Sequence, residues 1–139
     1  MRDDYKDSHV FPSGITIDYE SFTDEDYIRE FGEISGRYWG HVQNHAKARG
    51  LEFSVSIEDA WLKFINQDRK CALSGVSIEF RLDKATYRQT ASFDRIDSTL
   101  GYISGNVQWV HKEINLMKMN RDEHKFIEWC RLVCEHSKC

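Results

Sequence analysis

The chain has 139 residues and a mass of 16.4 kDa, which suits a single domain, and 40% of its residues are hydrophobic and 13% aromatic. With a mean hydropathy of -0.62, this composition predicts a water-soluble globular protein and excludes collagenous, low-complexity and disordered chains. The net charge of -4 combines -7 over residues 1–35 (ten acids, three bases) with +3 over residues 36–139 (thirteen acids, sixteen bases), so it does not exclude a polyanionic partner.

The first half of the chain is predicted to be mainly helical. TDED at residues 23–26 places a cap and acidic residues before a first amphipathic segment, and a glycine, Gly50, is a favourable stop for a second one. The predicted elements are a helix over 23–34, a helix over 37–49, a strand over 51–55 and a helix over 57–67 that is capped by Ser56.

The second half is predicted to contain a hairpin followed by helices. The apolar stretches ASF and VQWV flank a loop rich in turn residues, DRIDSTLGYISGN, and NRDE at residues 120–123 reads as a capping box. The predicted elements are a strand over 76–80, an exposed loop over 81–90, two hairpin strands over 91–93 and 107–110, a helix over 112–119 and a helix over 123–135.

We expect one domain, with residues 1–20 as an acidic N-terminal arm and residues 21–139 as the folded unit. No internal repeat or linker divides the chain, and its single proline is Pro12. No apolar run approaches the roughly 18 residues of a membrane span, and MRDDYKDSHV has no secretory signal. We therefore expect a cytoplasmic protein with no membrane partner and with reduced cysteines.

Asp94 and Asn115 are the first candidates for chemistry. Asp94 lies at the end of one predicted strand, and Asn115 lies on the first turns of the helix that follows the hairpin. Oxygen donors at these two places can share a hard divalent cation, because Mg²⁺ is commonly held by one or two protein oxygens together with water and phosphate. From these residues alone, the favoured interpretation is that Asp94 caps a turn and that Asn115 is a surface helix residue.

The segment SFDRIDSTLGYISGNVQWVHKEINLMK resembles the HNH endonucleases, or ββα-metal nucleases, and in particular their short phage and restriction-type members. That family has an Asp-His pair at the end of the first strand, an Asn on the second strand, and a His or Asn on the helix with a Lys three residues later. Asp94, Asn106, Asn115 and Lys118 match those places in order, within residues 71–118. The resemblance implies an α+β fold in which helices surround a ββα-metal hairpin-helix core at about residues 91–119.

The resemblance also implies site roles. Asp94 and Asn115 would hold one Mg²⁺ or Mn²⁺ ion per active site, and Asn106 would tie the loop back so that the catalytic strand end is fixed. Lys112, Lys118 and Arg49 would face the DNA backbone, although both lysines also suit simple solvated helix positions.

Arg95 departs from the family pattern, because it stands where most members have the His that deprotonates water. A guanidinium with a pKa above about 12 is no base at neutral pH. We expect Arg95 to clamp the scissile phosphate or neutralise transition-state charge, with Asp97 orienting it. The base would then be metal-bound hydroxide or one of three residues that precede the hairpin, which are His41, His45 and Glu52.

Structural zinc is not expected. Many HNH proteins carry two CxxC pairs around the hairpin, whereas the matching places here are Cys71, Ser74, His111 and Ile114, and a tetrahedral site needs four donors. Another group lies near the C-terminus and is better explained by cysteines on the apolar face of a helix; it consists of Cys130, Cys134, His136 and Cys139.

The favoured function is metal-dependent hydrolysis of phosphodiester bonds in DNA. Two alternatives stay open: a catalytically silent HNH-like module that binds DNA, and a non-nuclease whose acidic arm recruits a partner. The family's members indicate a bacterial cytoplasm as the place of action, with a phage gene as one source. Monomer or homodimer is left undecided.

Overall fold

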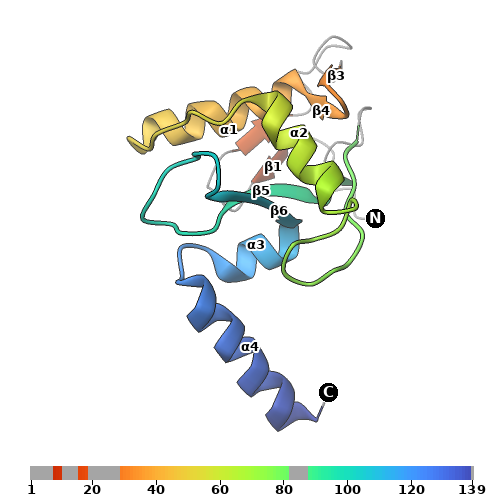
Figure 1. Cartoon of the computed structure of the whole chain (residues 1–139), viewed down its shortest axis with the longest axis vertical. Helices are drawn as coiled ribbons and strands as arrows, with labels where there is room; N and C mark the ends of the chain where they lie inside the picture. The colour runs from red at the N-terminus through yellow and green to blue at the C-terminus, as the bar shows by residue number, and fades with distance from the viewer. Residues whose placement is uncertain (1–7, 11–15, 19–28, 82–87, 139) are drawn as a thin grey trace.

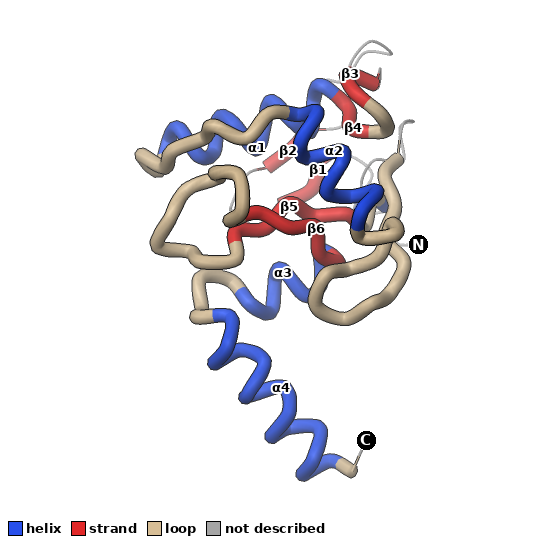
Figure 2. Tube along the Cα trace, in the orientation of Figure 1, coloured by secondary structure: helices blue, strands red, loops and turns tan. Residues whose placement is uncertain are grey.

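The computed structural model describes residues 8–10, 16–18, 29–81 and 88–138. This part of the chain has an α+β fold of four helices and three two-stranded antiparallel hairpins (Figures 1 and 2). The elements in chain order are β1 (Ser8–Val10), β2 (Thr16–Asp18), β3 (Arg29–Phe31), β4 (Ile34–Ser35), α1 (Gly36–Ala48), α2 (Ile57–Asn66), β5 (Ala91–Arg95), β6 (Val107–His111), α3 (Lys112–Lys118) and α4 (Glu123–Ser137).

The β5–β6 hairpin is the centre of the molecule. Helices α1 and α2 lie on one side of it, α3 lies on the other, and α4 extends away from the remaining elements (Figure 1). The β1–β2 hairpin falls within the expected acidic arm, but the other residues of that arm lie outside the described part of the chain. No helix among the described residues has both the length and the apolar character needed to cross a bilayer.

Helix α1 ends, and helix α2 begins, at signals found in the sequence. Ser35 and Ser56 are their N-caps, and each side chain accepts a hydrogen bond from a backbone N–H in the first turn. Gly50 follows α1 with a φ of +68° and donates its N–H to Lys47, a left-handed stop that glycine adopts without strain. The predicted helices over 37–49 and 57–67 are confirmed.

Trp109 on β6 is fully buried and organises the core. Its indole N–H donates to the carbonyl of Ala60 on α2, at 2.8 Å. The rings of Phe64, Phe80 and Phe93 pack around it, with centroid distances of 4.7 to 6.0 Å. The central hairpin is therefore fixed to α2 by aromatic packing and by a satisfied buried donor.

Three further hydrogen bonds join the helices to the hairpin backbone. The Tyr38 hydroxyl on α1 accepts from the N–H of Phe93 on β5 at 2.9 Å. At the end of α2, the Gln67 amide accepts from the N–H of Trp109 and donates to its carbonyl. The Tyr38 bond holds α1 against β5, and the two Gln67 bonds hold the end of α2 against β6.

The strand, loop, strand, helix order predicted for the last third is confirmed. Strands β5 and β6 pair in an unbroken antiparallel register that places Phe93 opposite Trp109 and Asp94 opposite Gln108. His111 ends β6 and caps α3, since its Nδ1 accepts from the N–H of Glu113 at 3.1 Å. The helix therefore starts immediately after the strand.

The predicted helix over 23–34 is wrong for residues 29–34, and residues 23–28 lie outside the described part of the chain. Residues 29–35 form the β3–β4 hairpin, which turns at Gly32 with a φ of +57°. A Cβ at Gly32 would lie 2.2 Å from the Trp61 ring, so the indole occupies the space that a helical side chain needs. The left-handed backbone and this close packing stop the helix that the apolar spacing suggests.

Two predicted strands are also absent from the described residues. Segments 51–55 and 76–80 each keep only one isolated bridge, Phe53 with Tyr102 and Lys70 with Ser77, because no neighbouring strand runs alongside them. The capping box at 120–123 is replaced by a cap at Asp122, whose carboxylate accepts from the N–H of Lys125 at 2.9 Å. The helix that follows starts where predicted.

The cysteines are not all reduced. Cys71 and Cys130 are free thiols, whereas Cys134 is disulfide-bonded. The expectation of four reduced cysteines is therefore wrong for Cys134.

We predict opposite stability changes for two Gly→Ala substitutions. A Cβ at Gly101 would lie 2.3 Å from the carbonyl oxygen of Glu52, a backbone atom that cannot turn away. Gly101→Ala should therefore lower the free energy of unfolding by about 1–3 kcal/mol. Gly40 lies within α1 with nothing inside 4 Å of its Cβ position, so Gly40→Ala should raise it by about 0.5–1 kcal/mol. Urea denaturation measures both changes, and equal effects would contradict the close packing of Gly101.

Candidate functional site

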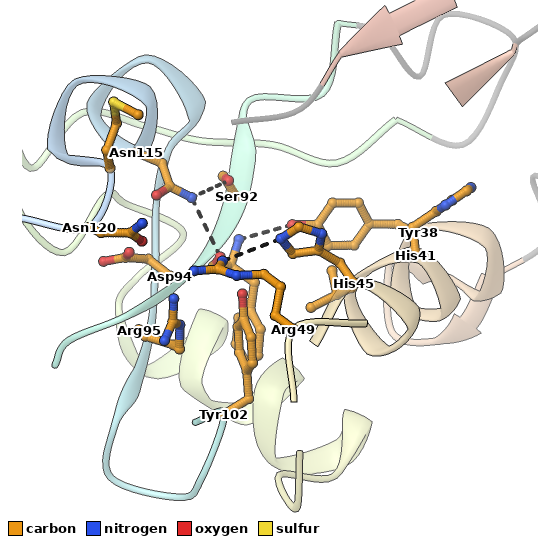
Figure 3. Close-up of a pocket in the computed structure, with 13 residues that line it drawn as sticks. Tyr38, His41, His45, Arg49, Ser92, Asp94, Arg95, Tyr102, Asn115 and Asn120 are labelled. Carbon is orange, nitrogen blue, oxygen red and sulfur yellow. Dashed lines mark hydrogen bonds between the residues drawn. The ribbon is translucent and has the colours of Figure 1, made fainter. Parts of the chain in front are cut away.

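A pocket of about 320 Å³ opens where α1 faces the end of β5 (Figure 3). One wall is a face of α1, and the opposite wall is built from β5, the loop after it and the end of α3. Its polar lining is Tyr38, His41, His45, Arg49, Ser92, Asp94, Arg95, Tyr102, Asn115 and Asn120. The pocket thus joins residues from the helical half of the chain to residues of the hairpin.

Asp94 is 5% exposed and presents its two carboxylate oxygens differently. Oδ2 accepts from the Lys118 ammonium at 2.7 Å and from the Gln108 amide at 2.9 Å. Oδ1 has no hydrogen-bond partner among the described residues and belongs to a side chain that lines the pocket. Burial raises the pKa of Asp94, and the hydrogen bonds from Lys118 and Gln108 oppose this rise.

Asn115 lies beside Asp94 and also keeps one oxygen for the pocket. Its Nδ2 donates to the Ser92 hydroxyl at 2.7 Å and to the Phe93 carbonyl at 3.5 Å, so the amide is anchored on β5 (Figure 3). Among the described residues Oδ1 of Asn115 accepts no hydrogen bond. A carboxylate oxygen and an amide oxygen are hard donors, and this donor set fits Mg²⁺ or Mn²⁺.

An ion here would depend on these two protein oxygens. No group of three or more His, Cys, Asp or Glu side chains suited to a metal occurs in the described parts of the chain. Two protein ligands are enough for Mg²⁺, which keeps several waters and takes further oxygens from a phosphate.

Lys118 does not face solvent, which corrects the expectation that it contacts the DNA backbone. Its side chain is 0% exposed, and its ammonium group donates to Asp94, to the Arg95 carbonyl at 2.9 Å and to Glu123 at 3.0 Å. An ammonium group has three donors, so these three bonds saturate it.

Arg95 is 6% exposed, and part of its guanidinium is used to hold the loop. Nη1 donates to the carbonyls of Ser98 and Leu100 at 2.6 and 2.9 Å, and the group lies over the Tyr102 ring with its central carbon 5.6 Å from the centroid. The loop carbonyls orient Arg95, whose side chain lines the pocket.

Asp97 does not pair with Arg95, which corrects a second expectation. Its carboxylate accepts from the backbone N–H and the hydroxyl of Thr99 at 2.9 and 2.6 Å. These two hydrogen bonds lower the pKa of Asp97 and close a local turn.

Asn106 ties the loop together, as expected, and does not line the pocket. Its Oδ1 accepts from the N–H of Asp97 at 2.8 Å, and its Nδ2 donates to the carbonyls of Asp97 and Gly101 at 3.0 and 2.9 Å. Its contribution to the site is to fix the loop that carries Arg95 and Tyr102.

His41, His45 and Arg49 are spaced four residues apart along α1, so they share one face, and that face lines the pocket. Figure 3 shows His45 directed toward the side of Asp94 and Arg95, whereas the ring of His41 turns away from them. His41 Nε2 is buried and lacks a hydrogen-bond partner among the described residues. Arg49 donates to His45 Nε2 at 3.3 Å, so this nitrogen carries no proton.

Both histidines favour the neutral form. Burial lowers the pKa of His41 and of His45, and the charges of Arg49 and Arg95 lower that of His45 further. A neutral imidazole near the candidate metal ligands is the state that can accept a proton.

Glu52 and Lys112 are not brought into the pocket. Glu52 is exposed, and its contribution is a backbone one, because its carbonyl accepts from the N–H of Tyr102 at 2.8 Å. Lys112 starts α3, and burial lowers its pKa. The geometry therefore removes Glu52 as a base at this pocket, and it gives Lys112 no place in the lining.

Of the four positions that match a zinc site in other HNH proteins, Cys71 is buried, His111 and Ile114 are half-buried and Ser74 is exposed. Burial tends to raise the pKa of the Cys71 thiol, but hydrogen bonds from Ser74, His111 and Leu73 outweigh burial and lower it. Ile114 packs against the core. The Cys71 sulfur thus receives backbone and side-chain donors in this part of the fold.

Four polar pocket residues were missed from the sequence: Tyr38, Ser92, Tyr102 and Asn120. Tyr102 belongs to the GY pair that the motif contains, so that pair was an available signal. Asn120 follows Met119, whose φ of +51° and ψ of -125° are unusual for a side chain of that size. No local pattern marks Tyr38 or Ser92, because their roles depend on the pairing of α1 and α3 with β5.

No protein-family model matches the sequence. Over 88 residues, 63% of its length, the chain is 31% identical to an uncharacterized 29.0 kDa protein from the dda-modA intergenic region of Enterobacteria phage T4, and it spans about a third (33%) of that relative.

A solved structure of the rare-cutting HNH restriction endonuclease PacI aligns with 84% of this chain and 89% of its own, with a TM-score of 0.55. The fold resembles that of an HNH endonuclease. Sequence identity in this alignment is 15%, so the likeness is one of fold. The expected α+β class is confirmed, and the chain has a phage relative.

We predict that Asn106→Ala loosens the loop at the pocket. The substitution leaves the N–H and carbonyl of Asp97 and the carbonyl of Gly101 without their partner, and one unsatisfied buried group costs about 1–3 kcal/mol. Asn44→Ala, on the exposed face of α1, is the matched control and should change the free energy of unfolding little. Thermal unfolding of both variants is the measurement, and equal melting temperatures would count against the tie.

Proposed function

We propose that this chain is a member of the HNH endonucleases and hydrolyses phosphodiester bonds in DNA with one divalent ion, Mg²⁺ or Mn²⁺. The observation that carries the proposal is the composition of one pocket, in which two oxygen donors, a neutral imidazole and two guanidinium groups meet. The likeness to the fold of PacI, an HNH restriction endonuclease, supports DNA as the substrate. A phage relative supports action in the cytoplasm of a bacterial host.

Asp94 and Asn115 are the proposed metal ligands, each through Oδ1. The ion would supply positive charge against the transition-state phosphate and the departing 3′ oxygen, an effect of several kcal/mol. Oδ2 of Asp94 and Nδ2 of Asn115 are bound within the protein, so both side chains are oriented before an ion arrives.

His45 is the proposed general base, in place of the His that most family members carry next to the Asp. Its Nε2 is unprotonated, and burial together with Arg49 and Arg95 keeps its pKa low. When a phosphate draws the Arg49 guanidinium away, the lone pair of Nε2 becomes available to take a proton from the attacking water. The base thus comes from α1 and not from β5.

Arg49 and Arg95 are the proposed phosphate contacts. They approach the pocket from α1 and from β5, so a phosphodiester placed between the two walls meets a guanidinium on either side. Arg95 has one edge fixed by loop carbonyls, which reduces the entropy that it loses on binding.

A catalytically silent DNA-binding module is the second candidate. The observation that favours it is Arg95 at the usual place of the base. Such a module would keep the guanidinium pair for phosphate and would not need a proton acceptor. The two candidates differ in whether DNA is cut in the presence of metal.

We predict metal-dependent cleavage of plasmid DNA and its loss in Asp94→Asn. Asparagine keeps an acceptor for Lys118 but removes the negative charge from the metal site, so the rate should fall by about 10²-fold or more. Asp94→Ala is a poorer test, because it also leaves the buried Lys118 ammonium without its partner. Nicking of supercoiled DNA in Mg²⁺ against a chelator control measures the rate.

Asp68→Asn is the matched control for this prediction, because Asp68 is a solvent-exposed acid far from the pocket lining. It should cleave at the parent rate. DNA binding without any metal-dependent nicking by the parent protein would instead favour the silent module, and equal rates for Asp94→Asn and Asp68→Asn would remove Asp94 as a ligand.

We predict that cleavage depends on the deprotonated form of His45. The pKa of His45 is lowered, so the rate should rise with pH through a value below the ordinary 6.5 and should be level at neutral pH. His45→Ala should lower kcat by about 10²- to 10⁴-fold and abolish this rise. His124→Ala, an exposed histidine on α4, is the control. A pH-rate profile that keeps the same acid limb in His45→Ala would show that this limb belongs to a group other than His45 and would contradict the prediction.

A further inference from the structure

We infer that Lys118, Gln108 and Glu123 are positioning residues that fix the direction in which Asp94 offers its free oxygen to a metal ion. The inference rests on the proposed function, since it takes Asp94 as a metal ligand. It assigns Lys118 a role different from the phosphate contact that the sequence suggested.

The three side chains and Asp94 form a closed ring of hydrogen bonds. The Lys118 ammonium donates to Oδ2 of Asp94 at 2.7 Å and to Oε1 of Glu123 at 3.0 Å. The Gln108 amide donates to the same two oxygens, at 2.9 and 2.7 Å. Two donors therefore bridge two carboxylates, and each carboxylate uses one oxygen for both bonds.

The ring leaves little freedom to its members. Lys118 is 0% exposed, Asp94 5% and Gln108 8%. The third ammonium hydrogen goes to the carbonyl of Arg95 on β5, so the lysine is bound to the strand that carries Asp94. Breaking one bond would leave a buried charge or donor unsatisfied, which costs more than the bond itself contributes.

The ring contains two carboxylates and one ammonium group. Lys118 neutralises one carboxylate, and the ring keeps a net charge of -1, which suits a cation in the adjacent pocket. Oδ2 of Asp94 is occupied by two donors, so Asp94 is left to bind an ion through Oδ1 alone. Glu123 is the first residue of α4, and the ring is thus a connection between that helix and the pocket.

The test is a charge-balanced double variant, Lys118→Met with Glu123→Gln. It removes one positive and one negative charge together, so the net charge near the metal stays the same while the ammonium bridge is lost. The matched control is Arg131→Met with Glu128→Gln, which removes an exposed ion pair of α4 in the same way. The measurements are Mn²⁺ binding by calorimetry without DNA, and DNA affinity in Ca²⁺ at several salt concentrations.

We expect the Lys118 double variant to bind Mn²⁺ about 10- to 100-fold more weakly than the parent, the usual effect of losing a residue that orients a ligand. The control should bind as the parent does. The salt dependence of DNA binding should be unchanged in the Lys118 double variant. In contrast, Arg49→Ala should make the slope of log K for DNA binding against log salt concentration less steep by about 0.9, the value for one phosphate contact.

Two results would overturn the inference. Mn²⁺ affinity equal to that of the matched control would show that the ring does not position Asp94. A salt slope that falls by about 0.9 in the Lys118 double variant, with Mn²⁺ affinity kept, would return Lys118 to a phosphate contact.

Gln108→Met keeps the inference testable if the double variant does not fold. This change removes the other bridging donor and leaves the ion pair of Lys118 with Asp94 in place. A weaker but measurable loss of Mn²⁺ affinity supports the ring, and an unchanged affinity overturns it. If the parent protein neither binds Mn²⁺ nor cleaves DNA, the proposed function and the inference are both overturned. If the parent does both and the variants bind Mn²⁺ as the parent does, the inference alone is overturned.

Discussion

The burial of a carboxylate at the end of β5 is the constraint on which the arrangement of the site depends. Asp94 is almost fully enclosed, and a buried charge is tolerated only where partners compensate for lost water. The compensation comes from three elements: Gln108 on β6, Lys118 on α3 and, through Lys118, Glu123 on α4. The hairpin, the short helix and the start of the last helix are therefore held together by a side chain that also lines the pocket.

The opposite wall of the pocket is set by packing and not by charge. Trp109 joins the hairpin to α2, and the Tyr38 hydroxyl joins α1 to β5, so the face of α1 that carries His45 and Arg49 is held against the strand end. This placement answers the chemical difficulty posed by Arg95, which cannot act as a base. A histidine from a different element reaches the same pocket, and burial together with the neighbouring guanidinium groups lowers the pKa of that histidine.

The sequence was sufficient for the parts of the fold that depend on local signals. The cap at Ser56, the stop at Gly50 and the strand, loop, strand, helix order were predictable, because the residues that decide them lie within a few positions of each other. Gly32 is a counterexample: the apolar spacing around it suggests a helix, and the indole of Trp61, distant in sequence, occupies the space instead. Lys118 is another, since a lysine on a helix reads as a surface charge until its three acceptors are brought together by folding.

The most direct measurement of the central claim is the anomalous difference density of Mn²⁺ in a crystal of this protein. We expect one Mn²⁺ peak in the pocket, within coordination distance of Oδ1 of Asp94 and Oδ1 of Asn115, while Oδ2 of Asp94 keeps its bonds to Lys118 and Gln108. Absence of density in the pocket at saturating Mn²⁺, or an ion bound to both oxygens of Asp94 with Lys118 displaced, would contradict it.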